Sequence, residues 1–85
     1  MKLAPGLNLT EIDEGTVLFD ENTGKYWHLN DVGTEVVRAV LADRDVSEVA
    51  AAISERTGAE YSMVDADCRG LLEEMVSAGL VSGRA

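Results

Sequence analysis

The sequence predicts an α+β fold in which a three-stranded antiparallel sheet is followed by three helices, as in a winged helix-turn-helix module with the wing placed first. Two observations support this prediction. The spacing of apolar residues changes once, near Asn30, from short strand-like runs to a helical period. Turn-forming and helix-capping residues then divide each half of the chain into three segments.

Three short segments before Asn30 have the composition of strands. Residues Leu7–Ile12 alternate apolar and polar side chains, and residues Thr16–Asp20 are rich in β-branched and aromatic types. Residues Lys25–Leu29 carry three ring-bearing side chains in a row. We therefore expect three short strands in this half of the chain.

The second and third expected strands should form a hairpin. The link between them, DENTG, is short and rich in residues that tolerate turn conformations, which favours antiparallel pairing. Successive strand residues point to opposite faces of a sheet. Trp27 and Leu29 should therefore share one face, and Tyr26 and His28 the other.

Three helix starts are marked by residues that can accept a hydrogen bond from a free first-turn N–H. These residues are Asn30, Asp45 and Ser62. Glycines at positions 58 and 79 mark the ends of the second and third helices. The expected helices are Asp31–Ala42, Val46–Thr57 and Met63–Ala78, each with an apolar stripe along one side.

Length and charge limit the function. A chain of 85 residues has room for one core, so we expect one domain spanning residues 1–85. Seven basic and sixteen acidic residues give a net charge of −9, which repels a phosphate backbone and argues against nucleic acid or an anionic membrane as partner. No apolar run is long enough to span a bilayer or to act as a secretory signal. We expect a cytoplasmic protein that binds peptides or proteins.

No pattern in the sequence indicates catalysis, a metal or a cofactor. His28 and Cys68 lie in different elements, and a Cys/His pair also needs an orienting group and an oxyanion site. The single cysteine lies on the apolar stripe of the last helix, so we interpret it as a core residue. The carboxylates in EIDE and LADRD lack the spacing of a calcium loop, and no phosphate-binding glycine loop is present.

The aromatic segment Lys25–Leu29 has two interpretations. Its rings can build the core against the helices, since aromatic side chains bury large areas. A small sheet also leaves an edge strand with unpaired N–H and C=O groups. Such an edge beside an apolar helix can receive an extended peptide as an added strand.

The chain also resembles a known family. The segments LFDENTGKYWHLN, LADRDVSEVAAAI and LLEEMVSAGLV are similar to those of PqqD-like proteins, the recognition elements that bind precursors of ribosomally made peptide natural products (RiPPs). The similarity covers about residues 15–83. A free-standing chain of this size most resembles the stand-alone member of lasso-peptide pathways, which works beside a separate leader peptidase and a cyclase.

This resemblance implies a binding site for the leader of a precursor peptide, with spaced Tyr, Pro and Leu anchors in the leader. The leader would pair with the third strand and lie in a groove between that strand and the third helix. The implied residues are Lys25, Tyr26, Trp27, His28 and Leu29 on the strand, and Asp67, Cys68, Leu71, Glu74 and Met75 on the helix. The residues alone leave the flank of the helix open, because Asp67/Leu71/Glu74 and Arg69/Leu72/Val76 both border its apolar face.

The main alternative is a winged-helix module that binds DNA or a transcription partner. A duplex reader carries clustered Lys and Arg on its recognition helix. The third helix instead offers one arginine among several carboxylates. The charge pattern therefore favours the peptide-binding interpretation.

Overall fold

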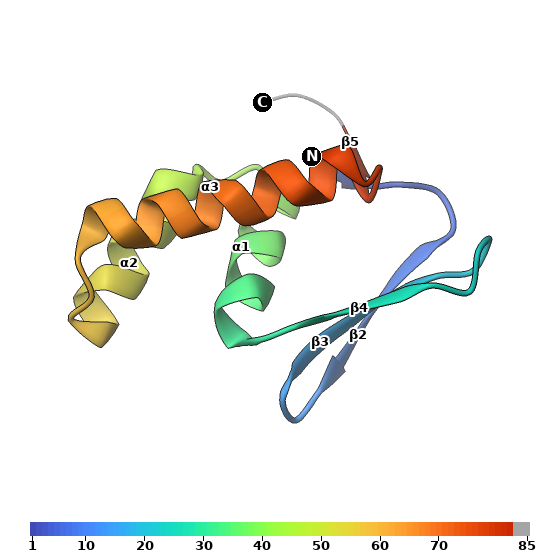
Figure 1. Ribbon diagram of the computed structural model, residues 1–85, viewed down its shortest axis with the longest axis horizontal. Coiled ribbons are helices and arrows are strands. Elements are labelled where there is room, and N and C mark those ends of the chain that lie inside the picture. The colour runs from blue at the N-terminus through green and yellow to red at the C-terminus, as the bar shows by residue number, and fades with distance from the viewer. Residues whose placement is uncertain (83–85) are drawn as a thin grey trace.

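The computed structural model describes residues 1–82 and confirms a three-stranded antiparallel sheet followed by three helices (Figure 1). The helices gather at one end of the molecule. The sheet begins where its last strand meets the first helix, passes below the end of the third helix and extends away from the helices. The strands are β1 (Lys2–Leu3), β2 (Leu7–Ile12), β3 (Gly15–Asp20), β4 (Tyr26–Leu29) and β5 (Val81–Ser82), and the helices are α1 (Asp31–Leu41), α2 (Val46–Thr57) and α3 (Tyr61–Ser77).

The main sheet has the order β2-β3-β4, with both neighbours antiparallel to the central β3. In the β3–β4 ladder, Thr16 lies opposite Leu29 and Phe19 opposite Tyr26. Gly24 closes the hairpin with a positive φ of 76°, a conformation that glycine adopts without strain. Since β4 pairs only with β3 in the described sheet, its other edge is open.

The buried side chains form two clusters that meet under α3. One lies among the helices and includes Val36, Ile53 and Cys68. The other lies between the sheet and α3 and includes Leu18, Leu29, Val37, Met75, Leu80 and Val81. Leu71 and Leu72 are partly buried and pack against both clusters, so α3 joins the sheet to the helices.

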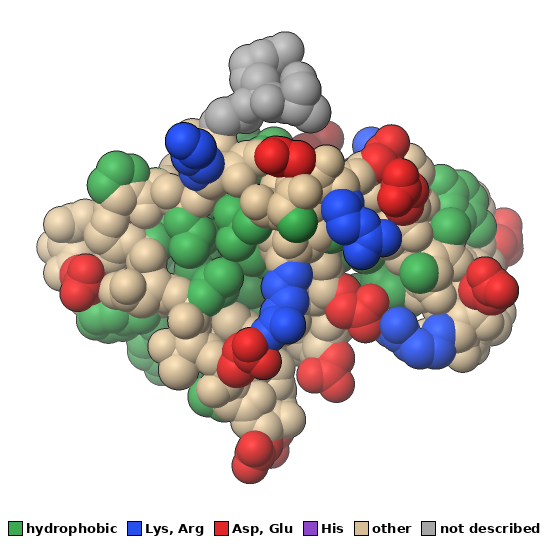
Figure 2. Space-filling view, turned by 180° about the vertical axis from the view of Figure 1, so that it is seen from behind, with side chains coloured by type: hydrophobic (Ala, Val, Ile, Leu, Met, Phe, Trp, Pro, Cys, Tyr) green, Lys and Arg blue, Asp and Glu red, His purple; other side chains and the backbone are tan. Residues whose placement is uncertain are grey.

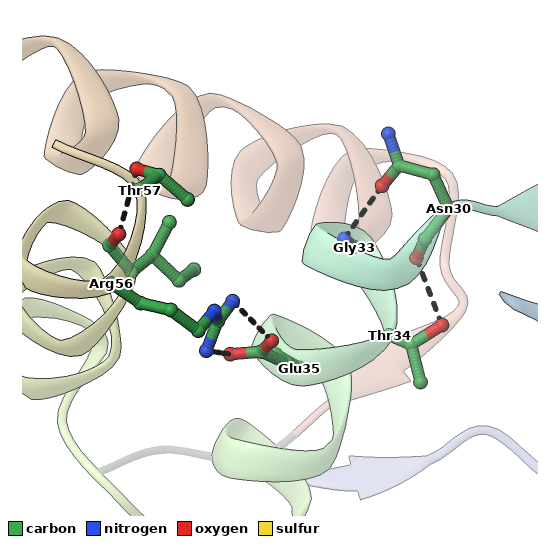
Figure 3. Close-up of polar contacts among 7 residues, drawn as sticks. Asn30, Gly33, Thr34, Glu35, Arg56 and Thr57 are labelled. Carbon is green, nitrogen blue, oxygen red and sulfur yellow. Dashed lines mark hydrogen bonds and ion pairs between the residues drawn. The ribbon is translucent and has the colours of Figure 1, made fainter. Parts of the chain in front are cut away.

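Two of the three expected helix caps are present. The side chain of Asn30 accepts the N–H of Gly33 at 2.8 Å, as Figure 3 shows. Asp45 caps α2 in the same way. The expected cap at Ser62 is wrong: α3 begins earlier, at Tyr61, and the hydroxyl of Ser62 donates to the Glu60 carboxylate at 2.9 Å.

A second, two-stranded sheet was not expected from the sequence. In it, Lys2 pairs with Ser82 and Leu3 with Val81. The two strands are short and lie at opposite ends of the chain, so no local pattern reports their pairing. They place Val81 in the core beside the sheet and thereby fix the end of α3.

Polar contacts also connect the helices to one another. The guanidinium of Arg56 on α2 lies 2.6 Å from a carboxylate oxygen of Glu35 on α1 (Figure 3). This pair is partly exposed, so it orients the helices more than it stabilises them. Among residues 1–82, no helix is both long and apolar enough to cross a membrane.

Candidate functional site

The direction of the backbone groups of β4 follows from the hairpin. The N–H of Asp20 donates to the carbonyl of Lys25 at 2.8 Å, which makes these residues a hydrogen-bonded pair. Hydrogen-bonded pairs recur at every second residue of an antiparallel ladder. Trp27 and Leu29 therefore turn their N–H and C=O groups inward to β3.

The two intervening residues, Tyr26 and His28, face the other way. By the same alternation, each directs one N–H and one C=O to the open edge of the sheet. An added antiparallel strand can use both groups of both residues. The edge of β4 therefore offers four backbone hydrogen-bonding groups to an extended peptide.

The space between β4 and α3 is hollow. A hollow of about 660 Å³ lies between the end of β4, the first turns of α1 and the middle of α3, and another of about 260 Å³ lies between Trp27 and the end of α3. Leu29 and Leu71 line both hollows, so the two form one groove. These two hollows together are called the groove.

The groove is apolar at its base and acidic at its rim. Asp67 lines the first hollow and Glu74 the second, and no Lys or Arg among residues 1–82 lines either one. Within residues 1–82, neither carboxylate takes part in an ion pair. The arginine of α3, Arg69, is bonded to Asp65 at 2.9 Å, and this hydrogen bond raises the pKa of the guanidinium. The groove therefore suits an occupant with apolar side chains and without negative charge.

Cys68 lies at the inner wall of the groove and is buried there. Its side chain is 1% exposed. Burial, and then the neighbouring carboxylates of Asp65 and Asp67, raise the pKa of its thiol. A thiol nucleophile requires the opposite shift, toward the thiolate. The ring of His28 contacts the carbonyl of Glu14 at 3.0 Å, away from Cys68.

The structure brings together most of the residues that the resemblance implied. The groove is lined by Trp27, His28, Leu29, Asp67, Cys68, Leu71, Glu74 and Met75. Two others lie outside it: Lys25 is in the hairpin link before β4, and the side chain of Tyr26 is 68% exposed on the outer face of the sheet. Tyr26 still borders the open edge through its backbone.

The two flanks of α3 that sequence reasoning left open line different hollows. Asp67, Leu71 and Glu74 line the groove. Arg69 and Leu72 line a separate hollow on the other side of the helix, and Val76 is exposed. Which flank lines the groove depends on how α3 is rotated about its axis over the sheet. The spacing of apolar residues in the sequence does not determine this rotation.

Sequence reasoning missed the floor of the groove. It is formed by the start of α1, including Asn30 and Gly33, and by residues after α3, including Leu80. Glycine is unfavourable inside a helix, so Gly33 was the one feature of the sequence that could have pointed to this floor. A Cβ there would lie 3.4 Å from Leu29 Cβ and 3.5 Å from Leu71 Cδ2, which are ordinary contact distances, so Gly33 lies directly against both groove walls.

The opposite edge of the main sheet, β2, also pairs only with β3, but it borders a smaller hollow. The hollow beside it measures about 250 Å³ and is lined by Leu9, Val37 and Arg38, among others. Arg38 on α1 forms an ion pair with Glu11 on β2 and so spans the space next to this strand. The edge of β4, which borders the larger hollow, is therefore the better receptor for an added strand.

The surface charge does not resemble that of a DNA-binding protein. On the face shown in Figure 2, Lys and Arg side chains lie beside Asp and Glu side chains and form no continuous basic stripe. Four of the five ion pairs among residues 1–82 use an arginine, so these cations are paired within the chain. No group of His, Cys, Asp and Glu in the described part of the chain could hold a metal ion.

Comparisons with known proteins agree with this geometry. The model of the family described as "Coenzyme PQQ synthesis protein D (PqqD)" matches residues 15–81. The structure titled "Lasso peptide synthetase B1 complexed with the leader peptide" is similar with a TM-score of 0.86 and 26% identity, over 96% of each chain. The structure titled "TbiB1 in Complex with the TbiA(beta) Leader Peptide" gives a TM-score of 0.81 and 26% identity, over 100% of this chain and 99% of the other. A comparison with curated proteins finds no match.

Proposed function

Because the chain belongs to the PqqD family, we propose that it binds the leader segment of a ribosomally made precursor peptide as a fourth strand on the edge of β4. It then delivers this precursor to a leader peptidase and a cyclase on separate chains, in the biosynthesis of a lasso peptide. The protein itself has no catalytic role. Its contribution is to hold the precursor by the leader.

The observation that carries this proposal is the meeting of an open strand edge with a groove. Backbone groups of Tyr26 and His28 give affinity for any extended chain, and they carry no sequence information. The hollows next to Trp27 and Leu71 can discriminate among the side chains that the added strand directs toward α3. A strand edge without the groove would bind without selectivity.

The comparisons support the choice of ligand. Both similar structures are titled as complexes with a leader peptide, and both cover nearly all of this chain. The lasso-peptide assignment rests on the first of these relatives, whose title names a lasso peptide synthetase, and on the resemblance of the sequence.

The absence of a catalytic role is supported by the setting of Cys68. Its buried thiol has a raised pKa beside the carboxylates of Asp65 and Asp67, and the histidine of the chain contacts a backbone carbonyl instead. Bond cleavage and cyclisation must then occur on partner proteins. The alternative function of a winged-helix DNA reader is disfavoured by the acidic rim of α3 and by the pairing of the arginines.

The direct test is a comparison of leader and core peptides. The probes are fluorescein-labelled synthetic peptides that carry the leader or the core of the precursor from the same pathway, with the TbiA(beta) leader as a second leader probe. Fluorescence anisotropy should show saturable binding of a leader probe and no binding of the core, because one edge strand holds only a short extended segment. Equal affinity for leader and core would contradict leader recognition. A DNA duplex serves as the probe of the alternative function.

A further inference from the structure

Gly70 is a glycine inside α3 that the packing of the chain does not explain. Glycine is the least favourable residue in a helix interior apart from proline. Other glycines differ from it: a Cβ at Gly15 would lie 1.9 Å from the carbonyl oxygen of Leu29, and a Cβ at Gly33 would contact Leu29 and Leu71 at 3.4 Å and 3.5 Å. A Cβ at Gly70 would meet no atom within 4 Å. The described structure therefore has room for a larger residue there.

The position of Gly70 connects it to the groove. On a helix surface, residues three and four positions apart are neighbours. Gly70 lies three residues after Asp67 and four before Glu74, and these two line the two hollows of the groove. Gly70 therefore lies between two residues of the groove rim and leaves a space there, because it has no side chain. Gly70 itself lines neither hollow, and it is partly exposed on the flank of α3 that carries these two residues.

An added strand would lie next to this gap. Neighbouring strands are about 4.8 Å apart, so a strand paired with β4 lies one such step beyond it, toward the open edge. There it passes the flank of α3 that carries Asp67 and Glu74. A side chain between these residues would project toward the added strand.

We propose that Gly70 is a steric selectivity position of the leader groove: its missing side chain lets the bound leader lie directly against the backbone of α3. The inference rests on the proposed leader binding and adds a residue to it. The glycine weakens the helix in the free protein and makes room in the complex. Stability and affinity should therefore respond in opposite directions when a side chain is added.

The test is a size series at this position. Gly70→Ala should raise the unfolding midpoint by about 4 °C or more, because alanine is the best helix former and the site is open. The same variant should bind the TbiA(beta) leader or the cognate leader several-fold more weakly. Gly70→Leu should bind at least about tenfold more weakly while remaining folded. Ala51→Leu, at an exposed position of α2, is the matched control and should bind leader as the parent does.

The possible outcomes separate the two proposals. If the parent protein binds no leader probe, the proposed function fails and the inference fails with it. If the parent binds leader and both Gly70 variants bind with unchanged affinity, leader binding stands and the steric role is refuted. If Ala51→Leu loses affinity as strongly as Gly70→Leu, the loss is not specific to the groove, and the steric role is again refuted.

Discussion

The open edge of β4 leads to a prediction that separates backbone from side-chain recognition. Replacing Tyr26 by proline removes an N–H that points away from β3 and leaves the ladder intact. Proline is tolerated at the first residue of an edge strand, which is the place of Tyr26 in β4. Its side chain is 68% exposed, so little packing is lost. Tyr26→Ala is the matched control, because it removes the ring and keeps the N–H.

The expected magnitude follows from the number of groups at the edge. Tyr26 and His28 together offer four groups, of which the proline removes one. One net hydrogen bond contributes about 0.5–1.5 kcal/mol, and its loss costs about 1–3 kcal/mol where it leaves a buried carbonyl without a partner. We therefore expect a loss of about 1–3 kcal/mol relative to Tyr26→Ala, or about 5- to 150-fold in Kd.

The assay is fluorescence anisotropy of a labelled leader, with circular dichroism and thermal unfolding as checks on folding. Trp27→Pro provides the contrast, because the N–H of Trp27 bonds inward to β3 and the side chain of Trp27 packs on the core. Trp27→Pro should therefore lower the stability of the fold itself, which thermal unfolding would show. If folded Tyr26→Pro binds leader as tightly as Tyr26→Ala, the leader does not pair with this edge in the predicted direction.

Three further predictions concern the groove and the caps. Asp67→Ala should weaken leader binding about two- to fivefold, as expected for an exposed charge, with the unfolding midpoint nearly unchanged; unchanged affinity would exclude this carboxylate from the site. Cys68→Ala should cost about 1 kcal/mol of stability in urea unfolding and leave leader affinity within a few-fold, whereas loss of precursor processing with intact binding would restore a catalytic role. Hydrogen bonds from the hydroxyl and then the N–H of Ser47 lower the pKa of Asp45 in the folded state, so its contribution to stability is present at neutral pH and lost as the pH falls through that lowered value. Asp45→Asn, which retains a capping oxygen, should flatten the decline in urea midpoint below about pH 4, and an unchanged decline would show that other carboxylates cause it.

Much of the fold could be predicted because its signals are local. The alternation in Leu7–Ile12 gave the bounds of β2, and Asp45 and Gly58 gave both ends of α2. The start of α3 could not be predicted in this way. Glu60 occupies the cap position without a side-chain hydrogen bond, so the more typical capping residue two positions later was misleading.

The candidate site was predictable on the strand and less so on the helix. Alternation alone separates the inward pair Trp27 and Leu29 from Tyr26 and His28. The wall formed by α3 depends on its rotation, which is set by burial of Met75 and Leu80 against the sheet. Those contacts join residues far apart in the sequence. The floor of the groove and the pairing of β1 with β5 have the same long-range origin.

The central claim is that a leader pairs with the open edge of β4, and amide hydrogen exchange measured by NMR tests it most directly. In the free protein, the amide of Trp27 should exchange slowly, because it bonds to β3, whereas those of Tyr26 and His28 should exchange fast. Saturating leader should slow exchange at Tyr26 and His28 and leave Trp27 little changed. If both amides still exchange fast when the leader is fully bound, the leader does not add a strand to β4.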